Sequence, residues 1–103
     1  ARLVLVDVDG AGLDALDLPG CAVERIAGSV ADEGLWQDIA GSLAGLDHAV
    51  VKAGIGAGGP IAAISLAEWR RVMAVNLDGA FLTLAHALRA MEAKAAGDDE
   101  DDV

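Results

Sequence analysis

The chain has 103 residues, 54% of them hydrophobic, and a formal net charge of -10 at pH 7. These values predict one small globular domain with a single apolar core. The acidic balance argues against a nucleic-acid or anionic-membrane surface, since phosphate groups require clustered Lys and Arg. No apolar run reaches the roughly 20 residues of a membrane span, and the first residues predict a strand without a secretory leader. The single cysteine fits a reducing cytoplasm.

The N-terminal part predicts a strand, a short helix and a second strand. Residues 2–6 form an apolar, β-rich run, and the leucines after it stop at Pro19-Gly20, a typical turn. Residues 21–27 predict the second strand, and its charges at Glu24 and Arg25 favour a sheet edge.

A second helix and a third strand follow. Asp32 stands where the helix dipole favours an anion, and Gly45 is placed to end the helix. Between them, apolar residues recur at helical spacing: Leu35, Trp36, Ile39 and Leu43. His48 to Lys52 then predict a third strand, and Gly54 to Pro60 a glycine-rich loop.

The last helix begins with a capping box, Ser65-x-x-Glu68, and is expected to bend between Asn76 and Gly79. An apolar seam follows on one face of it: Leu77, Phe81, Leu84, Leu88 and Met91. This seam predicts a helix packed on its own sheet, with a helix-helix dimer interface as the alternative. Residues 1–96 are therefore expected to form one domain, and the acidic residues 97–103 a disordered tail.

Few residues carry a chemical signal on their own. The carboxylate of Asp7, at the end of the first strand, can bind the hydroxyls of an adenosine ribose or make a turn. The Gly54-x-Gly56-x-x-Gly59 pattern predicts a loop rather than a dinucleotide fingerprint, because Pro60 and an apolar stretch precede the next helix. The histidines are isolated, so no metal site is expected, and Trp36 and Trp69 are expected to anchor the core.

The alternation of strands and helices predicts an α/β fold with a parallel sheet of about three strands. Beyond that, RLVLVD, the segment LDHAVVKAGIG and the pattern Trp69-x-x-Val72-Met73-x-Val75-Asn76-Leu77-x-Gly79 together resemble the short-chain dehydrogenase/reductase family. The resemblance implies a three-layer, Rossmann-like fold and NAD as the cofactor. Within it, Asp7 matches the acidic residue that favours NAD over NADP, and Ala53 and Gly54 lie beside the cofactor. Asn76 matches the helix asparagine of the proton relay, and Ser29 takes the place of an adenine-contacting Asp.

The departures from the family pattern are as informative as the matches. The Asn-Ala-Gly motif is here Lys52-Ala53-Gly54, and the sequence contains no tyrosine for a Tyr-x-x-x-Lys motif. The family's first strand, with its phosphate-binding glycine turn, also has no counterpart. We therefore expect a family fragment that is catalytically inactive alone. A residual NAD or adenine-nucleotide-binding module and an incomplete piece of an active oxidoreductase remain the alternatives.

A family sheet without its first strand has a hole about two strand spacings, or 10 Å, wide. Buried edges need hydrogen-bond partners. Either the sheet closes to a 2-1-3 order, as at the start of a flavodoxin-like fold, or another copy or fragment fills the hole. The sequence thus predicts closure or a homodimer, formed through the open sheet edge or the helix face from Leu77 to Met91.

Overall fold

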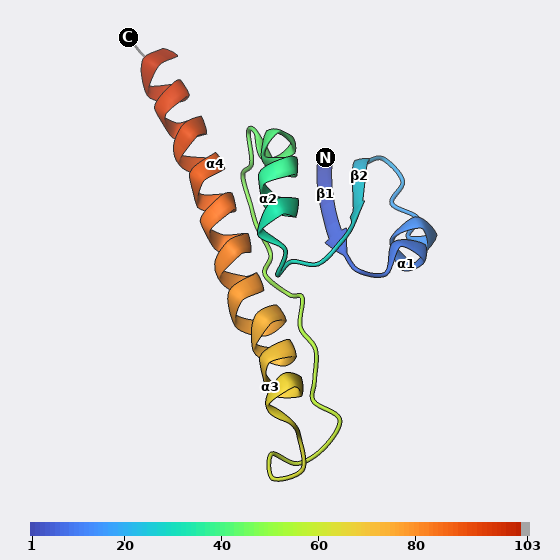
Figure 1. Cartoon of the computed structure of the whole chain (residues 1–103). Helices are drawn as coiled ribbons and strands as arrows, with labels where there is room; N and C mark the ends of the chain where they lie inside the picture. Colours follow the sequence, from blue (N-terminus) through green and yellow to red (C-terminus); the bar gives the residue numbers. More distant parts are fainter. Residues whose placement is uncertain (102–103) are drawn as a thin grey trace.

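The computed structural model describes the backbone of residues 1–101 and the side chains of residues 1–97. Two strands and one short helix come first, followed by two short helices, an irregular segment at residues 44–65 and a long helical rod (Figure 1). In chain order the elements are β1 (Arg2–Asp7), α1 (Gly10–Ala15), β2 (Ala22–Ala27), α2 (Glu33–Ile39), the 3-10 helix η1 (Ala40–Leu43), α3 (Leu66–Met73), the π-helix η2 (Ala74–Asp78) and α4 (Gly79–Asp101).

Polar caps fix the starts of the short helices, as the sequence predicts for α3; at α2, where the sequence predicts a favourable charge at Asp32, that side chain also caps the helix. Asp32 accepts hydrogen bonds from the backbone N–H groups of Gly34 and Leu35, at 3.0 and 3.4 Å. Ser65 accepts one from the Glu68 N–H at 3.1 Å. Such caps satisfy amides that have no partner within the helix.

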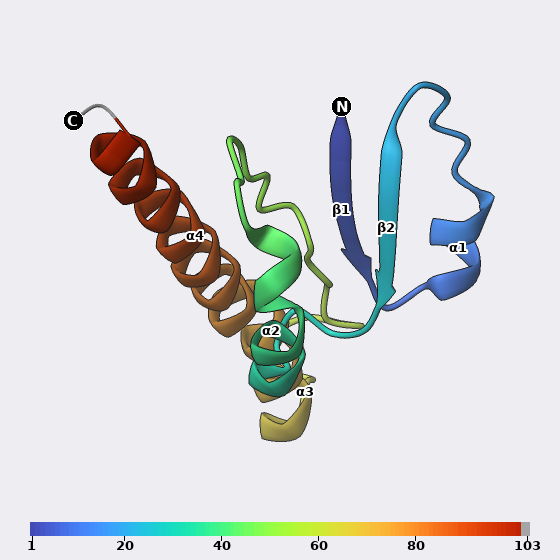
Figure 2. The ribbon, with the colours of Figure 1, turned by 90° about the horizontal axis from the view of Figure 1, so that it is seen from above.

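The sheet has two parallel strands, β1 and β2, with Val4 opposite Glu24 and Leu5 opposite Arg25. Helix α1 and helix α4 lie on opposite sides of these strands (Figure 2), which confirms the α/β architecture. The charged Arg25 in β2 has a structural role. Its guanidinium donates to the carbonyls of Leu13 and Leu16, at 2.8 and 2.7 Å, and so caps α1.

The predicted third strand, His48 to Lys52, does not form. This segment is extended but pairs with no strand, and Val50 is 81% exposed. Its two ends are attached to the long helical rod instead, through an ion pair of Asp47 with Lys94 and hydrogen bonds of Ile55 with Asn76. Closure of the sheet to a 2-1-3 order is therefore wrong for this structure, because the segment is held beside α4 and away from β1 (Figure 1).

The core lies between the sheet and α2. Four buried side chains form it: Val30, Trp36, Ile39 and Leu43. Trp36 is 4% exposed; its indole N–H donates to the Val30 carbonyl at 2.8 Å, and its ring stacks on His86 at 5.7 Å. Trp69 is 43% exposed, so the expectation that it anchors the core is wrong. Its helix, α3, makes its main contacts with η2 rather than with the sheet.

The apolar seam predicted on the last helix also faces away from the sheet, contrary to the prediction. Leu77, Phe81, Leu84 and Leu88 are 64%, 65%, 49% and 53% exposed, so this face does not pack on the sheet. Small residues line the face of α4 that packs on α2, η1 and the loop before α2, among them Gly79 and Ala87. A Cβ at Gly79 would lie 2.5 Å from Cγ2 of Val30, which explains why this close approach requires glycine.

Helices α3 and α4 join into one rod through η2, so the expected bend is a π-turn and not a break (Figure 1). The rod continues to Asp101, so the backbone of 97–101 is helical where the sequence predicts disorder. Residues 102 and 103 lie outside the described residues. The part of the disordered-tail prediction that covers them is not tested.

Candidate functional site

A cavity of about 710 Å³ lies between β1 and the extended segment 48–54. One long wall is the whole of β1, from Arg2 to Asp7, and the opposite wall is residues 48–54. Apolar side chains close both faces. Leu13 and Leu16 of the α1 region line it, and so do Val30, Trp36, Gly79, Ala80, Thr83 and Ala87 from α2, α4 and the loop before α2. The cavity therefore occupies the hole that the sequence predicts beside the second strand of the family.

The cofactor-binding residues that the resemblance implies lie together here. Asp7 comes from the end of β1, and Ala53 and Gly54 end the opposite wall. Asp7 is exposed, and its Oδ1 accepts the Asp9 N–H at 2.9 Å. The turn that the sequence offered as an alternative is thus present. It uses one carboxylate oxygen of Asp7 and is compatible with a hydroxyl bound at the other.

Asn76, the catalytic residue implied by the resemblance, lies behind this end of the cavity. Its Nδ2 donates to the Ile55 carbonyl at 2.8 Å, and its Oδ1 accepts the Ile55 N–H at 2.8 Å. A Cβ at Gly54 would lie 3.4 Å from the same Oδ1. Asn76 therefore positions the backbone of the 48–54 wall, and it does so from within a π-turn, a feature frequent at functional sites.

Lys52 and Ser29 take different positions. Lys52 is exposed and lines the cavity beside Ala53, so it places a cation within reach of an anion bound there. Ser29 accepts the Ala31 N–H at 3.1 Å and is not among the residues that line the cavity. It serves the loop between β2 and α2.

The helical wall of the cavity was not predicted from the sequence. Gly79, Thr83 and Ala87 of α4 contribute this wall. A signal for it was present, since small residues four apart share one helix face. The larger leucines on the opposite face dominate the sequence pattern, so the small-residue pattern was not recognised.

The clear electrostatic interactions lie away from the cavity. A hydrogen bond from Lys94 and its charge lower the pKa of the Asp47 carboxyl. A hydrogen bond from Arg71 likewise lowers the pKa of Glu68, which uses its carboxylate for this ion pair at 2.6 Å. Among the described residues, no group of three His, Cys, Asp or Glu side chains could hold a metal ion.

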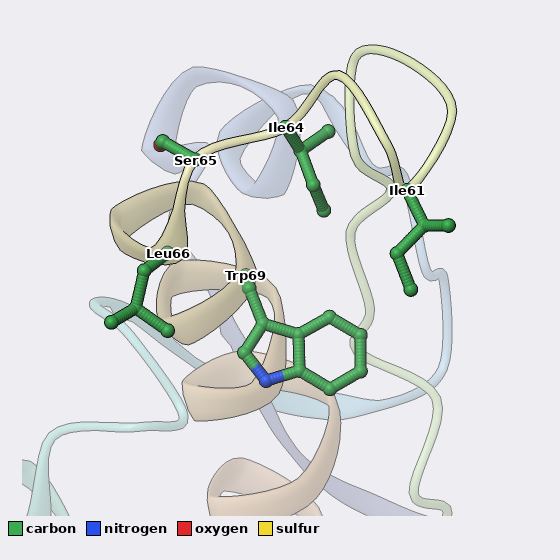
Figure 3. A pocket seen from close by; sticks show the side chains of 5 residues that line it. All are labelled: Ile61, Ile64, Ser65, Leu66 and Trp69. Atoms are coloured by element: carbon green, nitrogen blue, oxygen red, sulfur yellow. The ribbon is translucent and has the colours of Figure 1, made fainter.

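A second, shallower hollow of about 180 Å³ lies at the start of α3. Figure 3 shows its lining, which is Ile61, Ile64, Ser65, Leu66 and Trp69. Its one polar side chain, Ser65, already caps the helix. The indole N–H of Trp69 is the other polar group of the lining, so the hollow offers no acid, base or nucleophile besides Ser65. In the described part of the chain, no helix is long and apolar enough to cross a membrane.

Comparisons with known proteins agree with the arrangement of these elements. The family model for short chain dehydrogenases matches residues 26–98. A galactitol 2-dehydrogenase (L-tagatose-forming) of Cereibacter sphaeroides is 36% identical over 102 residues, which are 94% of this chain and 40% of that protein. The crystal structure of a short-chain dehydrogenase/reductase, a glucose/ribitol dehydrogenase from Brucella melitensis, superposes with a TM-score of 0.72. It is 33% identical, over 87% of this chain and 41% of that chain.

The chain thus spans about two fifths of the length of either relative. The family-model match covers the end of β2, all of α2 and nearly all of the rod of α3, η2 and α4. The chain belongs to the short-chain dehydrogenase/reductase family.

Proposed function

We propose that these 103 residues form a non-catalytic α/β part of an NAD-dependent dehydrogenase that holds the adenosine side of a weak nucleotide site. The observation that carries the proposal is the shared cavity end formed by Asp7, Ala53 and Gly54, which come from two separate walls. In an open parallel sheet, ligands bind at the carboxyl ends of the strands, where Asp7 stands.

The residues present fit the ribose of NAD better than its phosphates. A carboxylate such as that of Asp7 can accept hydrogen bonds from two ribose hydroxyls. Two Lys or Arg side chains, those of Arg2 and Lys52, line the described cavity, and the protein carries a net charge of -10. An anionic dinucleotide is therefore repelled at long range, and we expect its binding to be weak.

Hydride transfer needs a further group. NAD supplies the hydride acceptor when bound, and an acid must exchange a proton with the reacting oxygen. The sequence contains no tyrosine, and the amide of Asn76 is neither an acid nor a base near neutral pH. In this structure that amide is engaged with the backbone of Ile55. We therefore expect no turnover by these residues alone.

The test is a titration of the ¹⁵N-labelled chain with adenosine, 2′-deoxyadenosine and NAD, observed by NMR. Adenosine should shift the amides of Asp7, Val8 and Lys52 to Gly54, and 2′-deoxyadenosine should bind less tightly. Asp7→Asn should weaken adenosine binding. Asp14→Asn, which removes the same charge from an exposed site on α1, should not.

Each result decides a different part of the proposal. Absence of shifts near Asp7 at millimolar adenosine would refute the nucleotide site and leave the scaffold. Formation of NADH from galactitol or ribitol by the chain alone would instead refute the non-catalytic role.

A second candidate is an incomplete piece of an active oxidoreductase. It is favoured by the extent of the matches, which cover 40% and 41% of the relatives. Mass spectrometry of the natural protein from its source cells would test it. A product well above 10.4 kDa supports this candidate, and one of 10.4 kDa contradicts it. For either candidate we propose a cytoplasmic location, consistent with the unpaired, half-buried Cys21.

A further inference from the structure

Lys52 carries a charge that no side chain of the described structure neutralises. It is exposed and lines the 710 Å³ cavity, yet within the described residues its side chain makes no hydrogen bond or ion pair. The side chains of Arg70 and Arg89 also make no ion pair with a described residue, but neither of them lines this cavity. Asp7, on the opposite wall, does not pair with Lys52. Two opposite charges therefore share one cavity without neutralising each other.

The other Lys or Arg side chain of the cavity is committed to the fold. Arg2 donates hydrogen bonds to the carbonyls of Ser42 and Ala44, at 2.6 and 2.8 Å, and so holds the end of η1. It begins β1, which has six residues, whereas Asp7 ends this strand. The two residues are therefore about 17 Å apart along the strand. Lys52 is the cation left for an anion bound near Asp7.

The backbone that carries Lys52 is held on both sides. After it, Ile55 exchanges two hydrogen bonds of 2.8 Å with the side-chain amide of Asn76. Before it, Asp47 pairs with Lys94 of α4. The flexible part is thus the four-carbon stem of the lysine itself, and less freedom has to be lost when its ammonium group meets a ligand.

The opposite wall asks for a different group. Oδ1 of Asp7 accepts the Asp9 N–H at 2.9 Å, and its second carboxylate oxygen has no hydrogen-bond donor among the described residues. A carboxylate attracts hydroxyl groups and repels phosphate. Most of the residues that line the cavity are apolar. A ligand that reaches both walls therefore needs hydroxyl groups at Asp7, an anionic group at Lys52 and an apolar surface against the lining.

A nucleoside 5′-monophosphate combines these groups. Its ribose keeps both hydroxyls for a carboxylate, its base offers an apolar face, and its one phosphate needs one cation. A 2′- or 3′-phosphate would instead place its charge beside Asp7. A dinucleotide would bring a second phosphate, and the remaining cation of the described cavity, Arg2, is already bound to two carbonyls.

We infer that Lys52 is a specificity-determining residue, which pairs with the phosphate of a nucleoside 5′-monophosphate whose ribose hydroxyls bind Asp7. The inference rests on the proposed function, from which it takes the position of the ribose, and it adds the class of ligand. The net charge of -10 does not prevent this pairing. Exposed charges more than about 8 Å apart are largely screened at physiological ionic strength, so a contact pair outweighs distant acids.

The test compares the affinities of adenosine, 5′-AMP and 3′-AMP at physiological ionic strength, measured by NMR titration of the labelled chain. We expect 5′-AMP to bind about two- to fivefold more tightly than adenosine, as for an exposed ion pair, and 3′-AMP to bind more weakly than adenosine. Lys52→Gln should remove the preference for 5′-AMP and leave adenosine binding unchanged. Lys52→Arg, which keeps the charge, should retain the preference.

Arg70→Gln is the matched control, because it removes an exposed cation that lies outside the cavity. It should change none of the three affinities. Far-UV circular dichroism would verify that the variants keep the fold, which the exposure of both side chains favours.

The outcomes separate this inference from the proposed function. Equal binding of adenosine and 5′-AMP would overturn the inference and leave the ribose site in place. A preference for 5′-AMP that persists in Lys52→Gln would overturn it as well. If neither compound shifts the amides near Asp7, the proposed nucleotide site and the inference are both wrong. Binding of 5′-AMP without adenosine, lost in Lys52→Gln, would support the phosphate contact and contradict the ribose site.

Discussion

The side-chain amide of Asn76 makes two hydrogen bonds of 2.8 Å with the backbone of Ile55: its Nδ2 donates to the carbonyl and its Oδ1 accepts from the N–H. This pair connects the end of the extended wall of the cavity to the π-turn of the long helical rod. The substitution Asn76→Leu keeps the approximate size and removes both bonds. We expect a loss of about 1–2 kcal/mol in the free energy of unfolding, because each such bond contributes about 0.5–1.5 kcal/mol.

Urea unfolding and amide exchange of Ile55 would measure this loss. Gln37→Leu is the control, since it also replaces a side-chain amide with leucine, on an exposed face of α2. Equal stability of the two variants, with unchanged exchange at Ile55, would contradict a positioning role for Asn76.

The contact between Gly79 and Val30 predicts a steric effect. Gly79→Ala would place a Cβ 2.5 Å from Cγ2 of Val30 and should destabilise the fold by about 1–3 kcal/mol, as overpacking does. Gly97→Ala, in the same helix with open space around it, should stabilise by up to about 1 kcal/mol. Thermal unfolding would compare them. In a protein that already carries Val30→Ala, the loss of stability caused by Gly79→Ala should be smaller. Strictly additive changes in the free energy of unfolding would argue against the contact.

The two tryptophans should report different environments. Trp36 is 4% exposed and Trp69 43%, so Trp69→Phe should leave a blue-shifted emission that acrylamide quenches poorly. Trp69→Phe should change stability by no more than about 0.5 kcal/mol. Trp36→Phe should cost about 1–3 kcal/mol, because the buried carbonyl of Val30 loses its donor. Fluorescence and urea unfolding would check both, and strong quenching of Trp36 would refute its burial.

The ion pair of Asp47 with Lys94 predicts a pH effect. Because Lys94 lowers the pKa of Asp47 in the folded state, the pair stabilises the protein above the unfolded carboxyl pKa. That contribution is lost as the pH falls through the lowered value. Lys94→Gln should raise the pKa of Asp47 toward its ordinary value of 3.8, as followed by NMR of the side-chain carboxyl. Arg89→Gln, which removes a more distant cation from the same helix, should leave it in place.

We propose that the exposed face of α4 mediates self-association. The four large side chains at 77, 81, 84 and 88 recur at the spacing of a helix-helix seam, and two copies would cover them reciprocally. Sedimentation should show a dimer that Phe81→Glu dissociates, whereas Leu66→Glu, also at an exposed leucine, should not. A monomer at all concentrations would contradict this proposal.

Local features of the fold could be predicted from the sequence because their causes are local. The caps at Asp32 and Ser65 and the positive φ of 79° at Gly45 depend on a few adjacent residues. The family resemblance also assigned Asp7 and Gly54 to one cofactor site, and the structure brings both to one cavity.

Features that depend on distant partners could not be predicted in this way. His48 to Lys52 has the pattern of a buried strand, but a strand requires a neighbouring edge, and here the cavity lies between it and β1. The seam of α4 has the correct period, but its face was set by the small residues at 79 and 87, which allow the loop near Val30 to approach. Periodicity alone does not identify which surface comes close.

The π-turn at residues 74–78 limits the number of residues in this region as strongly as it limits their identity. Each residue of a helix turns the chain by about 100°, since a turn takes about 3.6 residues. Inserting a further residue between Met73 and Gly79 would rotate α3 relative to α4 by about that angle. It would carry the amide of Asn76 away from Ile55 or the notch at Gly79 away from Val30. Functional descendants of this chain should therefore accept substitutions here far more readily than insertions.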